Sequence, residues 1–283
     1  MKNYIWVMPG GGIFSRFLQC GIIPMADYEF DNAYLVLSGF ALTDPDDPYA
    51  QASWAHADRN CKLMAEYGIE DPYEHIVNYA IDQKVDRTYQ YQGYLPVGTM
   101  YDRNNPIELS PKLDSYKRTL QKIHIKSDIV NRVNTFVRDL SISSRTLGVH
   151  VRLTTMKLHQ NYEQVSLDDY IRTIDKELET GNYDNMYTAT DNVESLIKLE
   201  RRYGNIIRYY PNLLRLPSED IRNIDEFSWE YDMFFRKKFW QESYLECMTL
   251  SNCGGLVCRD SNFSNMAVVF SNSIKKVARV NNA

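Results

Sequence analysis

The sequence GVHVRLTT, residues 148–155, places two side chains with useful chemistry in an otherwise apolar run. Alternate side chains of a strand share a face, so His150 and Arg152 would point to one side and Val149 and Val151 to the other. A planar guanidinium can hold a phosphate through two parallel hydrogen bonds. A His on the same face could donate to a phosphate or to a sugar hydroxyl. An exposed polar pair on an edge strand is the structural alternative.

A glycine-rich turn near the N-terminus offers a second anion site. The sequence PGGGIFSRF follows an apolar run and precedes a helix-like pattern. The unhindered backbone amides of Gly11 and Gly12 would then lie at a helix N-terminus, where the helix dipole adds positive potential. Arg16, about one turn into that helix, could face the same ligand. A tight turn without a ligand is the alternative.

Two later segments end strands with polar residues. YTATD ends in Asp191, whose carboxylate could accept a hydrogen bond from a guanine amino group or a ribose, or could simply cap the next helix. CRDSNFSN contains Ser261 and Ser264 at a predicted helix start, where hydroxyl and backbone N–H groups can bind an anion. Helix capping by Asp260 or Ser261 is the alternative there.

The composition favours a globular protein without a general nucleic-acid surface. The chain has 283 residues, 44% of them apolar, and a net charge of −5, whereas nucleic-acid binders usually show a basic balance. Its five Cys include no CxxC pair, which indicates free thiols in a reducing compartment. No apolar run reaches the roughly 20 residues of a membrane span. The start MKNYIWVMPGGG is too short for a signal peptide, so we expect a cytoplasmic protein.

Strand and helix patterns alternate along much of the chain. YIWVM, the glycine turn, IFSRFLQCGIIPM and AYLVLS form a β-α-β opening. Residues 50–145 are less regular, with helices predicted over SWAHADRNCKLMAEYG and PKLDSYKRTLQKIHI. After residue 145 the alternation is regular. The predicted strands there are TLGVHVRLT, NMYTAT, NIIRYY and GGLVC, and the predicted helices are SLDDYIRTIDKELETG, DNVESLIKLERRYG, SWEYDMFFRKKFWQESYLECMTLS and SNFSNMAVVFSNS.

Helix boundaries in this half carry clear signals. Ser166 with an acid three residues later predicts a capping box, and Gly181 a helix end. Asp191 with Glu194 predicts the next N-cap, and Gly204 the next stop. Two β/α halves joined near residue 140 predict two Rossmann-like domains facing a cleft. Ligands in such sheets bind at the carboxyl ends of the strands.

The order of these motifs resembles a known family. Residues 11–19, GGIFSRFLQ, are similar to GGLGNRLFQ, and HVRL matches a strand that reads HxR or HxRRxD. TATDN resembles a strand end that reads ATDD, and DSNFS resembles a late SSxFS loop. Together they resemble the fucosyltransferase superfamily, which includes the bacterial α1,2-fucosyltransferases, the α1,6 enzymes of the nodulation type and the protein O-fucosyltransferases. Residues 40–140 show no matching motif.

The resemblance implies an α/β, GT-B-like fold with two Rossmann-like domains. Residues 1–140 would form the acceptor-side domain and residues 141–283 the nucleotide-sugar-binding domain, and the last residues could pack back onto the first. It implies an inverting glycosyltransferase that moves fucose from GDP-fucose to an oligosaccharide acceptor, with no essential metal and no further cofactor. Such an enzyme must stabilise a departing diphosphate with protein groups. The oligomeric state stays open.

The resemblance also implies roles for individual residues. Arg152 would neutralise the β-phosphate, His150 would contact the donor, and Asp191 would bind the base or the ribose. The residues that would cradle the pyrophosphate are Ser261, Asn262, Phe263 and Ser264. The residues that would close the donor site from the other domain are Gly11, Gly12 and Arg16. No catalytic base is assigned, because many carboxylates and His side chains qualify.

Several positions depart from the family pattern, and two other functions stay open. Leu153 stands in place of a second Arg, Phe14 in place of a Gly, Ser15 in place of an Asn, and Thr155 in place of an acid. A binding protein that kept the fold and lost catalysis is therefore one alternative. The other is a nicotinamide-dependent enzyme built on the PGGG turn. That enzyme requires an acid at the end of its second strand, where the chain offers only Asp44 in a loop.

Overall fold

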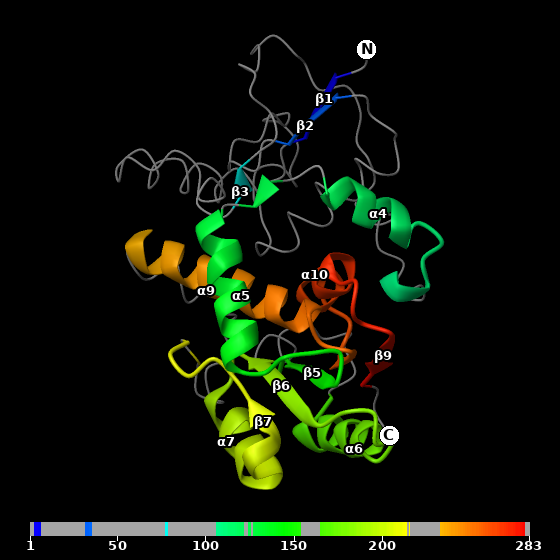
Figure 1. The fold of residues 1–283 in the computed structure, drawn as a ribbon, viewed down its shortest axis with the longest axis vertical. Coiled ribbons are helices and arrows are strands. Elements are labelled where there is room, and N and C mark those ends of the chain that lie inside the picture. The colour runs from blue at the N-terminus through cyan, green and yellow to red at the C-terminus, as the bar shows by residue number, and fades with distance from the viewer. Residues whose placement is uncertain are drawn as a thin grey trace, which may run out of the picture. The chain divides into compact units, whose positions relative to one another are not determined.

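The computed structural model describes residues 3–6, 32–35, 77–78, 106–121, 124–125, 127–153, 165–213, 215 and 233–280 (Figure 1). The chain divides into two compact units, Met1–Ser127 and Asp128–Ala283. We describe each unit by itself.

The first unit opens on a parallel strand pair. β1 (Asn3–Trp6) lies beside β2 (Asn32–Leu35), with Asn3 opposite Asn32. The parallel pairing confirms the expectation of a β-α-β opening for its two strands.

Short elements complete the described part of this unit. They are β3 (Val77–Asn78), η4 (Ile107–Leu109), α4 (Leu113–Leu120) and β4 (His124–Ile125), and β3 and β4 pair antiparallel. The helix predicted over PKLDSYKRTLQKIHI was too long. It ends at Leu120, and His124–Ile125 form the short strand β4 instead.

The second unit is a regular β/α structure. Its elements are α5 (Ser127–Asp139), β5 (Thr146–Val151), α6 (Leu167–Leu178), β6 (Asn185–Thr190), α7 (Val193–Tyr203), η6 (Gly204–Ile206), β7 (Ile207–Arg208), α9 (Met233–Ser251), β8 (Gly255–Cys258), α10 (Asn262–Phe270) and β9 (Lys276–Arg279). Its five strands are all parallel, in the order β7-β6-β5-β8-β9.

The strand order changes direction beside β5. From β5 the chain adds β6 and then β7 on one side, and it returns to place β8 on the other side. This arrangement makes the space at the carboxyl ends of β5 and β8 a topological switch point, which is where open parallel sheets bind ligands.

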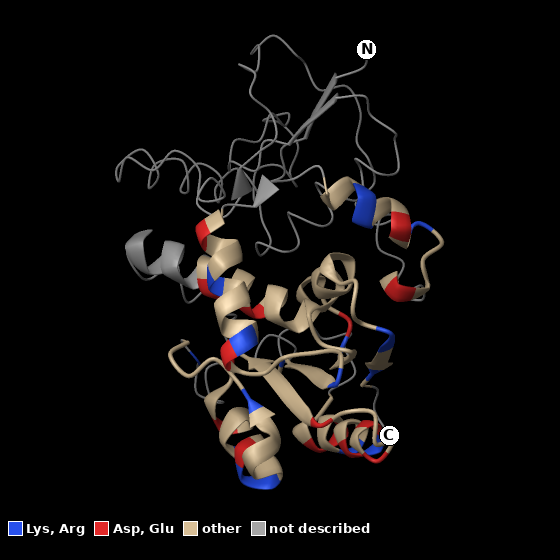
Figure 2. Ribbon diagram, in the orientation of Figure 1, with Lys and Arg blue, Asp and Glu red and all other residues tan. Residues whose placement is uncertain are grey.

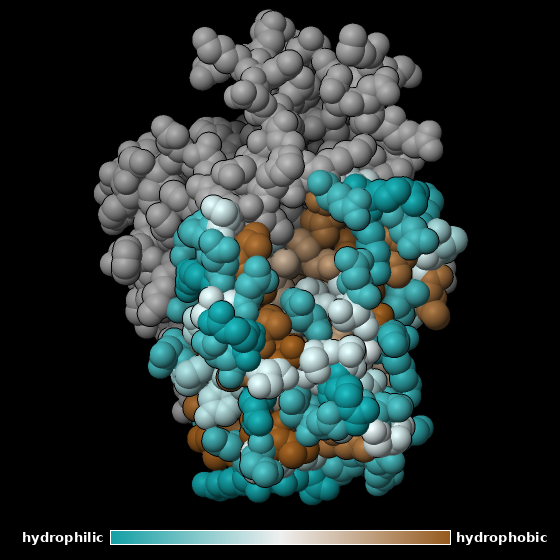
Figure 3. Space-filling view, in the orientation of Figure 1, coloured by the Kyte–Doolittle hydropathy of each residue, from teal (hydrophilic) through white to brown (hydrophobic). Residues whose placement is uncertain are grey.

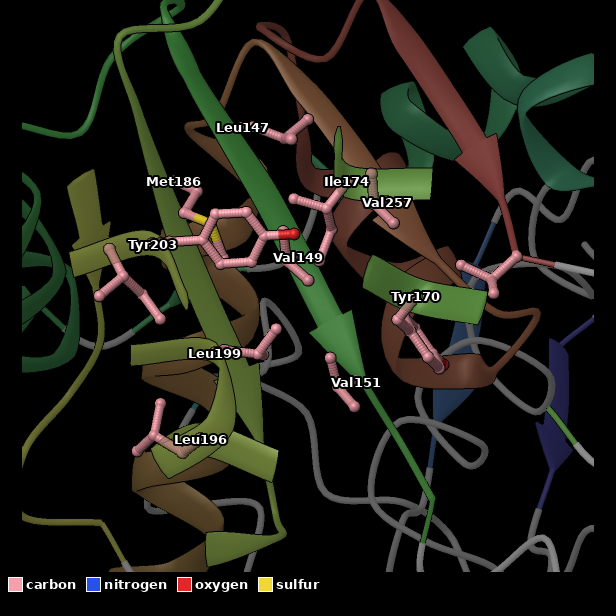
Figure 4. Packing of buried hydrophobic residues seen from close by; sticks show 12 residues of the cluster. Leu147, Val149, Val151, Tyr170, Ile174, Met186, Leu196, Leu199, Tyr203 and Val257 are labelled. Carbon is pink, nitrogen blue, oxygen red and sulfur yellow. The ribbon is translucent and has the colours of Figure 1, made fainter. Parts of the chain in front are cut away.

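One face of the sheet packs against α6 and α7. Val149 and Val151 of β5 are fully buried in a cluster that includes Tyr170 and Ile174 of α6 and Leu199 of α7 (Figure 4). The apolar alternation of β5 therefore does what its sequence predicts, since one set of alternate side chains forms the core beneath two helices.

The opposite face of the sheet packs against α9 and α10. A Cβ placed on Gly148 would lie 3.1 Å from Leu250 of α9. His150, two residues on, contacts α10. Because the side chains of Val149 and Val151 face α6, this alternation puts His150 on the α10 side, and it predicts the same side for Arg152, the residue after β5.

Helix ends follow the predicted signals with one correction. Ser166 begins α6 in a capping box with Asp169, and Gly204 ends α7 at a φ of 55°. The N-cap of α7 is Asn192, whose side chain accepts from the backbone N–H of Ser195 at 2.7 Å. The prediction that Asp191 caps this helix was wrong, so its carboxylate has to be explained in another way.

Charged residues lie mainly on the outside of this unit. Figure 2 shows Lys, Arg, Asp and Glu along α6 and α7, whereas the ribbons of β5 and β6 are mostly neutral. Figure 3 shows hydrophilic residues over much of the described surface, with hydrophobic residues between them. The three described Cys, Cys247, Cys253 and Cys258, are buried free thiols. None of the described helices combines the length and apolar character that a membrane-spanning helix needs.

Candidate functional site

His150 lies near the carboxyl end of β5, at the switch point. Its side chain is buried, and its ring stacks on Phe263 of α10 with centroids 4.4 Å apart and an interplanar angle of 26°. Nδ1 lies 2.9 Å from Oγ of Ser264. Burial and, second, the positive charge of Arg152 lower the pKa of His150 to about 3. The imidazole is therefore neutral at physiological pH.

The loop after β8 and the start of α10 complete this contact. Oγ of Ser261 caps the helix by accepting from the backbone N–H of Ser264 at 3.1 Å. The two serine hydroxyl oxygens are 2.7 Å apart. Ser264 also donates to the carbonyl oxygen of Arg259 at 2.9 Å. The predicted cluster of Ser261, Phe263 and Ser264 thus meets His150 at the ends of β8 and β5, and Asn262 is the first residue of α10.

Arg152 follows β5 directly and is partly exposed. Its backbone N–H donates to the hydroxyl oxygen of Tyr170 at 3.4 Å, and Tyr170 is fully buried in α6. This bond fixes the main chain at the strand end, and the positive charge of Arg152 acts on His150. Leu153 packs partly buried against the core cluster on the α6 side. A second Arg at that position would therefore point away from the face that carries His150 and Arg152.

Asp191 follows β6 at the level of Arg152, because Thr190 pairs with Val151 in the preceding position. Its charge acts on Glu246 of α9, which also feels the charge of Glu242 on the same helix, and the sequence reading missed both acidic residues. The carboxyl of Glu246 is buried 3.8 Å from the guanidinium of Arg215. Burial is the main cause that raises the pKa of Glu246 to about 8, although Arg215 opposes this, and the charges of Asp191 and Glu242 add to it. Only helical spacing on α9 could have signalled Glu242 and Glu246.

A second set of residues missed by the sequence reading supports the loop after β8. Arg279 of β9 donates to Oδ1 of Asp260 and to Oδ1 of Asn265, both at 3.2 Å. Asn265, which is fully buried in α10, donates to the same oxygen of Asp260 at 3.2 Å. These bonds tie the last strand to the segment that carries Ser261 and Ser264. No sequence pattern indicated these bonds, because KKVAR is short and rich in Lys and Arg.

The remaining predicted site residues lie outside the described residues. They are Gly11, Gly12 and Arg16, together with the departures Phe14, Ser15 and Thr155. Among the residues that the structure describes, no three His, Cys, Asp or Glu side chains are grouped to hold a metal ion.

The arrangement combines three kinds of group within one strand-end region. A guanidinium can bind an anion, a neutral imidazole beside a helix start can form a directional hydrogen bond, and a carboxylate on the next strand can accept one. Such a set suits a ligand that carries both an anionic part and a polar neutral part.

The fold is similar to that of solved fucosyltransferases, although neither a family profile nor a curated protein sequence matches the chain. NodZ α-1,6-fucosyltransferase co-crystallised with GDP aligns over 96% of this chain and 93% of that chain, with 11% identity and a TM-score of 0.54. Fucosyltransferase NodZ from Bradyrhizobium aligns over 94% and 92%, with 11% identity and a TM-score of 0.53.

Other alignments are weaker. POFUT1 in complex with GDP-fucose aligns over 99% of this chain and 98% of that chain, with 12% identity and a TM-score of 0.48. An alignment to NodZ soaked with GDP-fucose covers 56% of this chain and 47% of that chain, so it spans about half of the NodZ chain. Taken over nearly its whole length, the chain has an α/β, GT-B-like fold that is similar to the fold of the solved NodZ fucosyltransferase.

Proposed function

We propose that this chain is a glycosyltransferase that binds a nucleoside diphosphate sugar at the carboxyl ends of β5, β6 and β8. The observation that carries the proposal is the contact of His150, two residues before Arg152, with the start of α10 at the switch point of a parallel sheet. The fold of NodZ, co-crystallised with GDP, supports the same ligand class.

The donor we propose is GDP-fucose, and the acceptor is an oligosaccharide. In an inverting transfer, an acceptor hydroxyl oxygen bonds to C1 of fucose on the face opposite the diphosphate. The bond between C1 and the β-phosphate oxygen breaks, and GDP leaves with the electron pair. A protein base, still unassigned, takes the hydroxyl proton. Residues 1–140 would provide the acceptor side and residues 141–283 the donor side.

Arg152 would stabilise the leaving diphosphate. Its guanidinium can donate two hydrogen bonds to β-phosphate oxygens as negative charge develops there, which lowers the barrier without a metal ion. The bond from its backbone N–H to Tyr170 holds this strand end in place before the donor binds. Asp191, on the neighbouring strand, would accept from the guanine or the ribose.

Calorimetric titration with GDP, UDP and NAD tests this proposal. Wild type should bind GDP in preference to UDP and NAD, and Arg152→Ala should weaken GDP binding roughly 30- to 100-fold, the loss of hydrogen bonds to a charged group. Arg152→Lys should recover only part of the affinity, because an ammonium lacks the planar fork.

Arg145→Ala is the matched control. Arg145 lies just before the same strand, at the opposite end, where it is exposed and forms an ion pair with Asp184. We expect it to bind GDP like wild type. Binding of NAD without GDP would favour the nicotinamide enzyme, and an Arg152→Ala variant that binds GDP normally would refute the proposed site. GDP binding without turnover of GDP-fucose in the presence of glycans would indicate a binding protein.

A further inference from the structure

The hydroxyl of Ser264 lies at the centre of a closed hydrogen-bond network. Its oxygen is 2.9 Å from Nδ1 of His150, 2.7 Å from Oγ of Ser261 and 2.9 Å from the carbonyl oxygen of Arg259. The Ser264 side chain is fully buried. A serine hydroxyl has one hydrogen to donate and two lone pairs to accept with, so three partners use its whole capacity.

Only one arrangement of hydrogens satisfies all three contacts. The carbonyl oxygen of Arg259 can only accept, so Ser264 must donate its single hydroxyl hydrogen to that oxygen. Ser261 and His150 must then both donate to Oγ of Ser264. Ser261 is able to do so, because its own oxygen accepts from the backbone N–H of Ser264 and its hydroxyl hydrogen is left over. Nδ1 of His150 must therefore carry a hydrogen.

This arrangement determines what the other ring nitrogen can do. In a neutral imidazole only one nitrogen is protonated, so Nε2 of His150 carries a lone pair and can only accept. Nε2 makes no hydrogen bond to the described residues. The adjacent Arg152 carries the opposite chemistry, since a guanidinium can only donate.

We propose that Ser264 is a positioning residue that fixes His150 as a hydrogen-bond acceptor, so that His150 takes a hydroxyl or N–H group of the nucleoside and not a phosphate oxygen. This proposal rests on the proposed function of the site. It divides the ligand between two residues of one strand face. Arg152 takes the anionic part, and the lone pair of Nε2 repels that part and accepts from the neutral part.

The hydrogen on His150 can be observed directly. Two-bond ¹H–¹⁵N correlations in His-labelled protein distinguish the two imidazole tautomers, and the His150 signals are those missing from the spectrum of His150→Gln. We expect wild type at pH 7 to show Nδ1–H and an unprotonated Nε2. An Nε2–H tautomer in wild type overturns the proposal, whether or not the Ser264 variants fold.

The variant Ser264→Ala removes the acceptor of Nδ1–H. We expect the hydrogen to move in part or wholly to Nε2 in this variant, and Ser264→Thr, which keeps a hydroxyl, to restore the wild-type tautomer. Ser166→Ala is the matched control, because Ser166 is also a serine that bonds at a helix start, and it lies at α6. A folded Ser264→Ala variant that keeps the wild-type tautomer overturns the proposal.

Binding of GDP and of inorganic pyrophosphate separates this inference from the proposed function. Ser264→Ala should weaken GDP about three- to tenfold, as expected for one hydrogen bond. It should leave pyrophosphate unchanged, because the bond from Ser264 to the carbonyl oxygen of Arg259 leaves its hydroxyl no hydrogen to donate to a phosphate, contrary to the cradle role that the resemblance implies. Arg152→Ala should weaken both. Equal loss of both ligands in Ser264→Ala would mean that Ser264 has only a general structural role, which overturns the proposal. If wild type binds neither ligand, the proposed function fails, and the proposal about the nucleoside group fails with it, whereas the tautomer still decides whether Ser264 positions the proton.

Discussion

His150 and Arg152 are two residues apart on one strand face, yet their environments differ. His150 is enclosed by Phe263 and Ser264, and it is neutral because desolvation favours the uncharged form. Arg152 follows the strand end, is partly exposed and carries a cationic guanidinium. Burial depth along one strand thus converts two basic residue types into one neutral and one cationic group.

The low pKa of His150 has a consequence for stability. Its folded-state pKa of about 3 lies below the ordinary value of 6.5, so the unfolded chain binds a proton below pH 6.5 that the folded chain does not. The contribution of this neutral His to stability is fully present above pH 6.5 and is lost as the pH falls toward 3. Linkage gives a loss of about 2 kcal/mol between pH 7 and pH 5.

Urea unfolding of wild type and His150→Gln at pH 7 and pH 5 measures this loss. The variant cannot titrate at this position, so its free energy of unfolding should fall by about 2 kcal/mol less than that of wild type over the same interval. All other titrating groups are shared and cancel in the comparison. Parallel losses in the two proteins would show that His150 titrates normally in the folded state.

Residue-level predictions from the sequence succeeded where strand alternation alone was decisive. The pattern of β5 placed His150 and Arg152 on one face, and the structure confirms this for His150 by its contact with α10. It failed for Asp191, because Asp and the following Asn192 are equally good N-caps in sequence terms. The choice between them depends on how the buried Asn192 packs at the end of β6. Local propensity alone does not predict this packing.

At the scale of elements, the turn between α9 and β8 contains a glycine, Gly254, that lies close to the turn before β5. A Cβ on Gly254 would lie 1.8 Å from the carbonyl oxygen of Ser144, which is backbone and cannot rotate away. The backbone N–H of Gly254 also donates to the carbonyl of Thr146 at 2.9 Å. This close approach aligns the start of β8 with the start of β5.

Gly254→Ala should therefore destabilise the protein by about 3 kcal/mol or prevent folding, because the backbone must shift to admit the methyl group. Gly181→Ala is the control: nothing lies within 4 Å of its Cβ position, and only the φ of 69° opposes the change. We expect the control to lose about 1 kcal/mol. Chemical unfolding of the two variants compares them, and equal losses would contradict the predicted clash.

The elements that sequence patterns missed are those with weak local signals. β9 has the sequence KVAR and lies at the edge of the sheet, where charged residues are common and apolar alternation is short. The strand predicted over NIIRYY is reduced to β7, since its first residues form a 3-10 turn. In contrast, β5, β6, β8 and their helices were predictable, because buried parallel strands and capped helices have strong patterns.

For the whole molecule, the comparison with NodZ shows that two chains with few identical residues can share this fold. The two chains are 11% identical and share a fold over nearly their full lengths. The order of motifs along the chain indicated this fold, and in the second unit three of them lie at the carboxyl ends of β5, β6 and β8 in one sheet. The second unit supplied the clear β/α alternation, whereas residues 40–140 gave no recognisable motif.

Two of the three described thiols lie beside the site that we propose. Sγ of Cys247 donates to the carbonyl oxygen of Phe263 at 3.6 Å, and Cys258 lies opposite His150 on the neighbouring strand. Burial raises the pKa of Cys247 and Cys253 above the ordinary thiol range, which makes them poor nucleophiles while the fold is closed.

The rate of thiol modification therefore reports how often the second unit opens. In a variant with Cys20→Ser and Cys61→Ser, a thiol reagent can act on the remaining three Cys only as fast as that unit opens. A nucleotide at 100 times its dissociation constant should slow global opening about 100-fold by mass action. Mass spectrometry of alkylation with and without GDP would give this ratio, and unchanged rates at saturating GDP would show that the thiols react through openings that GDP binding does not suppress.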